Sequence, residues 1–60
     1  MTATRTFPPG TSIRVRHPNN VMERATVVRN GTDAEGPFTE VRWLDGAEER
    51  VRRSQVEGRA

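Results

Sequence analysis

Arginine is the residue of this sequence best suited to binding chemistry. The chain has ten basic residues among its 60, and all of them are arginine. A guanidinium group is a planar fork of hydrogen-bond donors that matches the oxygens of a phosphate or a carboxylate. The net charge is only +2, so the composition permits nucleic acid as a partner without requiring it. For the absence of lysine itself we favour a simpler explanation, codon bias in a GC-rich genome.

The sequence offers little for catalysis or for metal binding. It has one histidine, no cysteine and no glycine-rich phosphate loop. Proton transfer needs a positioned partner, and a metal site needs several ligands. His17 precedes Pro18, and we interpret it as a surface loop residue, while Asp33 and Glu35 are interpreted as solvated loop carboxylates. We therefore expect no enzymatic activity, no cofactor and no metal site.

Short segments of β-type sequence must position the arginines. Residues 11–17 alternate strictly, with Ile13 and Val15 on one face and Arg14 and Arg16 on the other, which is typical of a half-buried strand. Helical periodicity is absent. We expect strands at residues 11–17, 23–30, 38–44 and 47–53, followed by a short turn into a last strand at 54–57 with Val56 facing inward.

The sequence leaves open which face of the second strand is buried, and its turn residues predict a loop after that strand. Either Ala25 and Val27 face the core, or Thr26 and Val28 do, because both alternations are apolar enough. Residues 30–37, NGTDAEGP, are expected to form a long, mobile, acidic loop.

The hairpin between the third and fourth strands turns at Asp45-Gly46. Val41 and Trp43 share a face, and we expect Trp43 to lie in the core. A two-residue turn would place Val41 opposite Arg50 and mix the two faces, so we predict a longer turn or a bulge with Gly46 at positive φ.

A turn centred on Gly46 sets a definite register for this hairpin. It predicts the pairs Val41 with Val51, Trp43 with Glu49, Glu40 with Arg52, and Arg42 with Arg50. The last pair sets two like charges side by side, an unfavourable arrangement that an anion would relieve.

The chain is long enough for one small domain. We expect a flexible, disordered N-terminal segment at residues 1–9, because Pro8-Pro9-Gly10 resists regular structure, and a domain at residues 10–58. Phe7 is expected to fold back onto the domain as an anchor. Residues 1–10 lack the apolar region of a signal peptide and no stretch is long enough to span a membrane, so we expect a cytoplasmic protein.

The segments PGTSIRV, ATVV, FTEVRWLDGAEERV and SQVE together resemble an SH3-like small barrel. The pattern is similar to Tudor- and KOW-like modules, to the accessory barrel of some bacterial SNF2-type helicases, and to small stand-alone actinobacterial barrels with a VRW-DG core. It covers about residues 9–57 and rests on positions that mostly keep the fold: Gly10, Val15, Val27, Val41, Trp43, Asp45, Gly46, Val51, Val56 and Glu57.

The resemblance implies an all-β, SH3-like barrel of about five antiparallel strands, of bacterial or phage origin, that serves as a non-catalytic accessory binding module. A Tudor-type cage for methyl-lysine needs several aromatic side chains. The chain has no tyrosine and only Phe7, Phe38 and Trp43, which argues against recognition of that kind.

Outward alternation groups most strand arginines on exposed faces, Arg14 among them. The predicted function is weakly sequence-specific nucleic-acid binding. The alternative is a protein-interaction module that uses a strand edge or the 30–37 loop and can assemble into a homo-oligomer. The residues predicted to bind nucleic acid are Arg16, Arg42, Arg50, Arg52 and Arg53.

Overall fold

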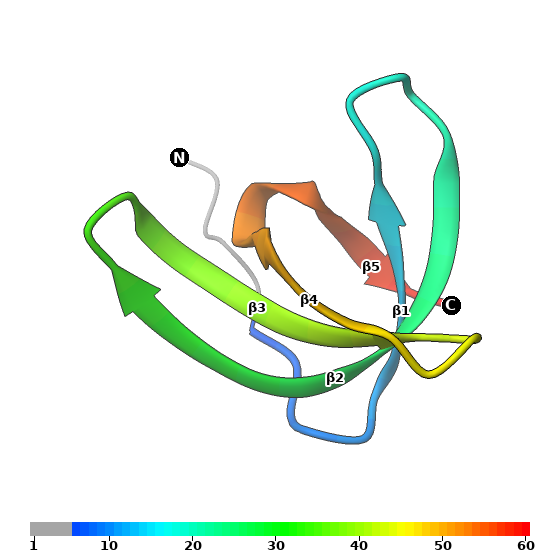
Figure 1. Ribbon diagram of the computed structural model, residues 1–60, viewed down its shortest axis with the longest axis horizontal. Coiled ribbons are helices and arrows are strands. Elements are labelled where there is room, and N and C mark those ends of the chain that lie inside the picture. The colour runs from blue at the N-terminus through cyan, green and yellow to red at the C-terminus, as the bar shows by residue number, and fades with distance from the viewer. Residues whose placement is uncertain (1–5) are drawn as a thin grey trace.

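Five antiparallel strands form a single sheet in the computed structural model, which describes residues 6–60. The sheet order is β4-β3-β2-β1-β5 (Figure 1). The all-β prediction is confirmed, and the arrangement is compatible with a small β-barrel. No helix in the described range is long and apolar enough to cross a membrane. The elements are β1 (Ser12–Arg16), β2 (Met22–Asp33), β3 (Gly36–Trp43), β4 (Glu48–Arg52), the single 3-10 turn η1 (Arg53–Gln55) and β5 (Val56–Arg59).

The core is built by the inward-facing residues of the strands. Ile13 and Val15 of β1 are fully buried, whereas Arg14 and Arg16 are exposed, as the alternation predicts. Burial of apolar surface is the main favourable contribution to folding, and here it is spread over many small side chains. The core comprises Phe7, Ile13, Val15, Ala25, Val27, Val41, Trp43 and Val51, with Val56 packed against it.

A β-bulge in β2 explains why the facing of this strand was ambiguous in the sequence. Val27 is paired with Val41 and Arg29 with Glu40, so Val28 is the extra residue. A bulge reverses the alternation and bends the strand. Before it, Ala25 and Val27 face the core, and Figure 1 shows β2 and β3 curving together where they pair, from Ala25 onward.

The prediction of a long loop at residues 30–37 is wrong. The β2–β3 ladder continues to the pair Asp33 and Gly36, which leaves only Ala34 and Glu35 in the turn. Asp33 closes this turn by accepting a hydrogen bond from the Glu35 backbone N–H at 2.9 Å, and Gly36 has φ of 114°. Asp33 and Gly36 therefore flank a two-residue turn, and Asn30-Gly31 lies inside the strand.

The predicted register of β3 and β4 is also wrong, by two residues. The observed outer-face pairs are Arg42 with Glu48 and Glu40 with Arg50, and Val41 lies opposite Glu49. Because a shift of two residues keeps each side chain on its face, the inward facing of β3 survives the error. The pairs that do not form are Val41–Val51, Trp43–Glu49, Glu40–Arg52 and Arg42–Arg50.

The β3–β4 turn spans three residues, which is the cause of that shift. The Trp43 backbone N–H donates to the Ala47 carbonyl at 2.8 Å, and the Gly46 N–H donates to the Trp43 carbonyl at 2.9 Å. The Asp45 carboxylate accepts the Ala47 N–H at 2.9 Å. Gly46 has φ of 92°, which confirms the predicted positive φ. The loop is centred on Asp45, not on Gly46.

The segment before β1 is held against the sheet. Phe7 is only 6% exposed and belongs to the core, so the prediction that it anchors the segment is confirmed. Its carbonyl accepts a hydrogen bond from the Asn30 side chain at 2.8 Å, and the Gly10 N–H donates to the Val27 carbonyl at 2.8 Å. Residues 1–5 of the predicted flexible segment 1–9 lie outside the described residues.

Candidate nucleic-acid interface

Two of the predicted binding arginines, Arg50 and Arg52, belong to an ion-pair network on the outer face of β2, β3 and β4. Asp33 pairs with Arg52 at 2.8 Å and with Arg50 at 3.1 Å. Glu40 pairs with Arg29 at 2.6 Å and with Arg50 at 3.2 Å. These five residues, called the Asp33–Glu40 network below, satisfy each other's charges within the fold.

The network also covers an aromatic ring on the outer face of β3. Phe38 is only 3% exposed although it lies outside the main core. The guanidinium carbon of Arg50 lies 3.8 Å from the ring centroid, and that of Arg29 lies at 5.4 Å. A stacked guanidinium removes apolar surface from water and gains a cation–π attraction. Arg50 therefore has a structural task, which its sequence position alone did not reveal.

Acid should weaken this network, because its carboxylates are stabilised in the charged form. The Arg52 guanidinium holds the pKa of the Asp33 carboxyl well below its usual range, and the Glu35 backbone N–H and Arg50 contribute in the same direction. Hydrogen bonds from Arg29 and then Arg50 lower the pKa of Glu40. A carboxyl whose pKa is lower in the folded state contributes stability above its unfolded pKa, and this stability is lost as the pH falls through the folded value.

We expect the protein to lose stability as the pH falls below about 4, the range in which unfolded carboxyls take up protons. The Asp33→Asn variant tests the cause. Its melting temperature should lie below that of the parent at neutral pH, and the difference should shrink towards about pH 2. Thermal unfolding followed by circular dichroism across this pH range measures both effects.

The matched control for that variant is Glu35→Gln. Glu35 is an exposed neighbour in the same turn and has no ion-pair partner among residues 6–60. Its substitution should shift the melting temperature less than Asp33→Asn does at neutral pH, because Glu35 makes no ion pair among residues 6–60. If the deficit of Asp33→Asn stays constant from neutral to acid pH, the carboxylate does not carry this stability.

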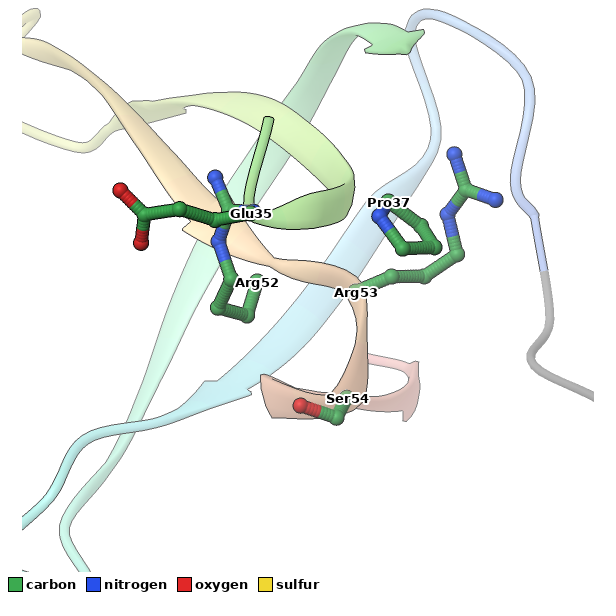
Figure 2. Close-up of a pocket in the computed structure, with 5 residues that line it drawn as sticks. All are labelled: Glu35, Pro37, Arg52, Arg53 and Ser54. Atoms are coloured by element: carbon green, nitrogen blue, oxygen red, sulfur yellow. The ribbon is translucent and has the colours of Figure 1, made fainter. Parts of the chain in front are cut away.

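Arg53 and Arg52 line a shallow hollow of about 200 Å³ between the β2–β3 turn and η1. Figure 2 shows it with Glu35, Pro37 and Ser54, and the Arg53 side chain runs past Pro37. Arg52 is engaged by Asp33 through two hydrogen bonds of 2.9 and 2.8 Å.

Arg53 is likewise occupied by the protein itself. One of its terminal nitrogens donates to the carbonyls of Gly31 and Phe38, each at 3.2 Å. Its Nε atom is buried without a partner among the described residues. These contacts tie η1 to the β2–β3 hairpin, so the guanidinium of Arg53 is a fold-holding group.

The other two predicted arginines, Arg16 and Arg42, have exposed side chains and one carboxylate partner each. Arg16 donates to both oxygens of Glu57 at 2.9 and 3.1 Å, and 45% of its side chain is exposed. Arg42 pairs with Glu48 at 2.7 Å and is 59% exposed. Exposed pairs of this kind contribute little to stability because solvent screens them, so an incoming anion can compete with them.

An arginine pair missing from the predicted site lies between Arg16 and Arg42. Arg14 of β1 and Arg24 of β2 are directly opposite each other in the register, and both are exposed. Neither has a carboxylate or hydrogen-bond partner among residues 6–60. The signal that could have found the pair is the β1–β2 register, which follows from the turn after His17.

Small residues lie on two sides of this pair, and the exposed pair of Arg16 and Met22 follows on the third. Ser12 and Thr26 form the adjacent exposed cross-strand pair, and Gly58 of β5 is the partner of Arg14 on its other side. Gly58 has no side chain of its own, and a Cβ atom built on it would meet nothing within 4 Å outside its two chain neighbours. We call Ser12, Arg14, Arg24 and Thr26 the arginine face.

His17 lies outside the strands, as predicted, and its partly exposed side chain makes specific contacts. Its ring stacks on Trp43 with centroids 5.2 Å apart, and its Nε2 atom lies 2.8 Å from a Glu23 oxygen. The indole N–H of Trp43 donates to Glu49 at 3.1 Å. Within residues 6–60, no group of three or more histidine and acidic side chains is arranged to hold a metal ion. His17 covers the edge of the core.

Comparisons with known proteins add no family: no family model, no curated protein and no solved structure significantly matches the chain.

Proposed function

We propose that this chain is a non-catalytic binding module with an SH3-like small-barrel fold, and that its arginine face contacts the backbone of nucleic acid. The strand order β4-β3-β2-β1-β5, with one 3-10 turn between β4 and β5, supports the SH3-like assignment. Arginine, serine and threonine side chains and backbone N–H groups are the usual donors to phosphate oxygens.

The observation that carries the proposal is the opposed pair of Arg14 and Arg24. Like charges directly opposite in a sheet destabilise it. A phosphate between the two guanidinium groups would turn this repulsion into attraction on both sides. Arg14 also contributes to lowering the pKa of Glu57, after the larger effect of Arg16, so its positive field reaches across to β5.

The proposal changes the residues expected to bind. Arg16 and Arg42 flank the arginine face and remain in the proposed interface as exposed outer members. Arg50, Arg52 and Arg53 are assigned to the fold, because their donors already serve Asp33, Glu40 and backbone carbonyls.

Anisotropy titration of a labelled duplex of mixed sequence tests the proposal. Binding should weaken as salt rises, with a log–log slope of about −0.9 for each phosphate neutralised. Arg14→Gln and Arg24→Gln should each raise Kd roughly threefold to tenfold, equivalent to about 0.6–1.4 kcal/mol. Each should also reduce the magnitude of the salt slope by about 0.9, the value for one phosphate contact. This reduction should be the same for nucleic acids of different sequence.

Arg29→Gln is the charge-matched control for this titration. It removes one positive charge from an arginine that is 55% exposed but paired with Glu40 beyond the β2 bulge. Its effect on Kd should be small. If all three substitutions weaken binding equally, the protein binds through its net charge and the arginine face has no special role.

A protein partner is the second candidate function, and one observation favours it. Leu44 at the tip of the β3–β4 hairpin is 82% exposed. From the sequence, either a strand edge or the 30–37 loop was the expected surface for a protein partner. Residues 30–37 form a paired hairpin and not a loop, whereas the strand edges of β4 and β5 remain. Absence of any nucleic-acid binding at about 50 mM salt, where phosphate contacts are strong, would favour this candidate.

A further inference from the structure

Nucleic-acid ligands differ in whether their bases are accessible, and the aromatic residues of this chain bear on that difference. Proteins that bind single strands commonly stack bases on exposed aromatic rings. The whole chain contains two phenylalanines, one tryptophan and no tyrosine. Phe7, Phe38 and Trp43 are 6%, 3% and 9% exposed. No phenylalanine or tryptophan ring is therefore left on the surface as a stacking platform, and the partly exposed imidazole of His17 already stacks on Trp43.

The ring faces are also occupied by other side chains. His17 stacks on Trp43, Arg50 lies over Phe38, and Arg59 lies 5.4 Å from the centroid of the Phe7 ring. A base could reach one of these rings only by displacing its cover. For Phe38 this would also break the contacts of Arg50 with Asp33 and Glu40.

Single-strand binders also carry a basic groove that follows the strand, and neither of two hollows found among residues 6–60 provides one at the arginine face. Arg14 and Arg24 lie on outward faces of adjacent strands, and neither lines either of two hollows in the described surface. One of these hollows is lined by Glu40, Glu48 and Glu49 with Arg50, so its charge would repel phosphate.

What the arginine face offers is a cluster of donors on an open surface. Such a cluster suits phosphates that are already fixed in space. A duplex carries about one charge per 1.7 Å of its axis, and its phosphates are held in a regular array. A single strand has a lower charge density, and its backbone must be ordered on binding.

We propose that the ligand of the arginine face is double-helical nucleic acid, bound through its phosphates, and not unstacked single strands. This inference rests on the proposed function and narrows it to one class of ligand. Duplex DNA and duplex RNA share the recognised chemistry, so both belong in the test.

The test compares the affinity of the full chain for a short mixed-sequence duplex and for each of its separated strands, as DNA and as RNA. At about 50 mM salt, at least one duplex form should bind about tenfold more tightly than its strands. Arg14→Gln with Arg24→Gln should remove most of this preference. Both arginines are exposed, so the double variant is expected to fold, and circular dichroism checks this.

Trp43 supplies an independent readout as the sole tryptophan of the chain. Because its ring is buried, saturating single strands should leave its emission almost unchanged. Strong quenching by single strands, or strand affinity equal to duplex affinity with Arg14 and Arg24 still required, would overturn the duplex inference and leave the proposed function intact. Binding to neither form would remove both.

Discussion

The Trp43→Ala variant is expected to be largely unfolded at 25 °C. Trp43 is 9% exposed, belongs to the core and is paired in register with Ala25 at the centre of the sheet. Truncating a buried tryptophan costs about 3–5 kcal/mol. A domain of this length has about 3–9 kcal/mol of stability in total.

Two further contacts would be lost with the indole ring. His17 would lose its stacking partner, and Glu49 would lose the hydrogen bond from the indole N–H. The Trp43→Phe variant separates these effects, since it keeps an aromatic ring but not the N–H donor. Its stability should lie between those of the parent and Trp43→Ala.

Urea unfolding followed by far-ultraviolet circular dichroism measures these differences, because the variants lack the only tryptophan. Leu44→Ala is the matched control, since Leu44 is the next residue along the chain and is 82% exposed. It should unfold at nearly the parent concentration of urea. If Trp43→Ala also unfolds there, the indole ring is not a core residue and the facing of β3 must be reconsidered.

The sequence predicted which face of β1 and of β3 is buried, but it did not predict the pairing register between β3 and β4. Alternation of apolar and polar residues reports which face is buried, so the inward facing of Ile13, Val15, Val41 and Trp43 was accessible. Register depends on how many residues a turn holds. The β3–β4 turn holds three, fixed by the Asp45 carboxylate and the positive φ of Gly46, and a shift of two residues leaves the facing unchanged.

The candidate site depended on register and was therefore only partly predictable. The wrong register left Arg42 and Arg50 without carboxylate partners, whereas the structure gives them Glu48 and Glu40. It also hid the pair that has no carboxylate or hydrogen-bond partner among residues 6–60, Arg14 with Arg24. Exposure of arginine was predictable from alternation, but the partner of each arginine was not.

The sequence also failed to predict the extension of the β2–β3 hairpin to Asp33 and Gly36. Asn30-Gly31 is a strong turn signal on its own. Here the Asn30 side chain instead donates a hydrogen bond to the Phe7 carbonyl and accepts one from the Thr39 hydroxyl. Gly31 lies under the ring of Phe38. A glycine within a strand can mark the close approach of another group, and at Gly31 that group is the Phe38 ring.

The Gly31→Ala variant is expected to be destabilised by about 1–3 kcal/mol, the cost of overpacking a filled site. A Cβ atom at Gly31 would lie 2.6 Å from Cζ of Phe38 and 3.0 Å from its Cε2. The ring has little room to move, because it is 3% exposed and lies 3.8 Å beneath the Arg50 guanidinium. Gly31 does not have positive φ, so the backbone itself accepts alanine.

The direction of this effect is what makes it informative. Without the ring, replacing a strand glycine by alanine should stabilise the protein by about 0.4–1 kcal/mol, because the unfolded chain loses freedom. The Phe38→Leu background removes Cζ and both Cε atoms, which are the atoms that the new methyl group would meet. Adding Gly31→Ala there should be neutral or stabilising.

A double-mutant cycle built from these four proteins isolates the contact between residues 31 and 38. The coupling between the two substitutions should reach about 1 kcal/mol or more, since the side chains touch directly. Thermal or urea unfolding of each protein gives the four stabilities. If Gly31→Ala lowers the free energy of unfolding equally in both backgrounds, Phe38 does not cover Gly31. The Phe38 ring would then not be packed against β2.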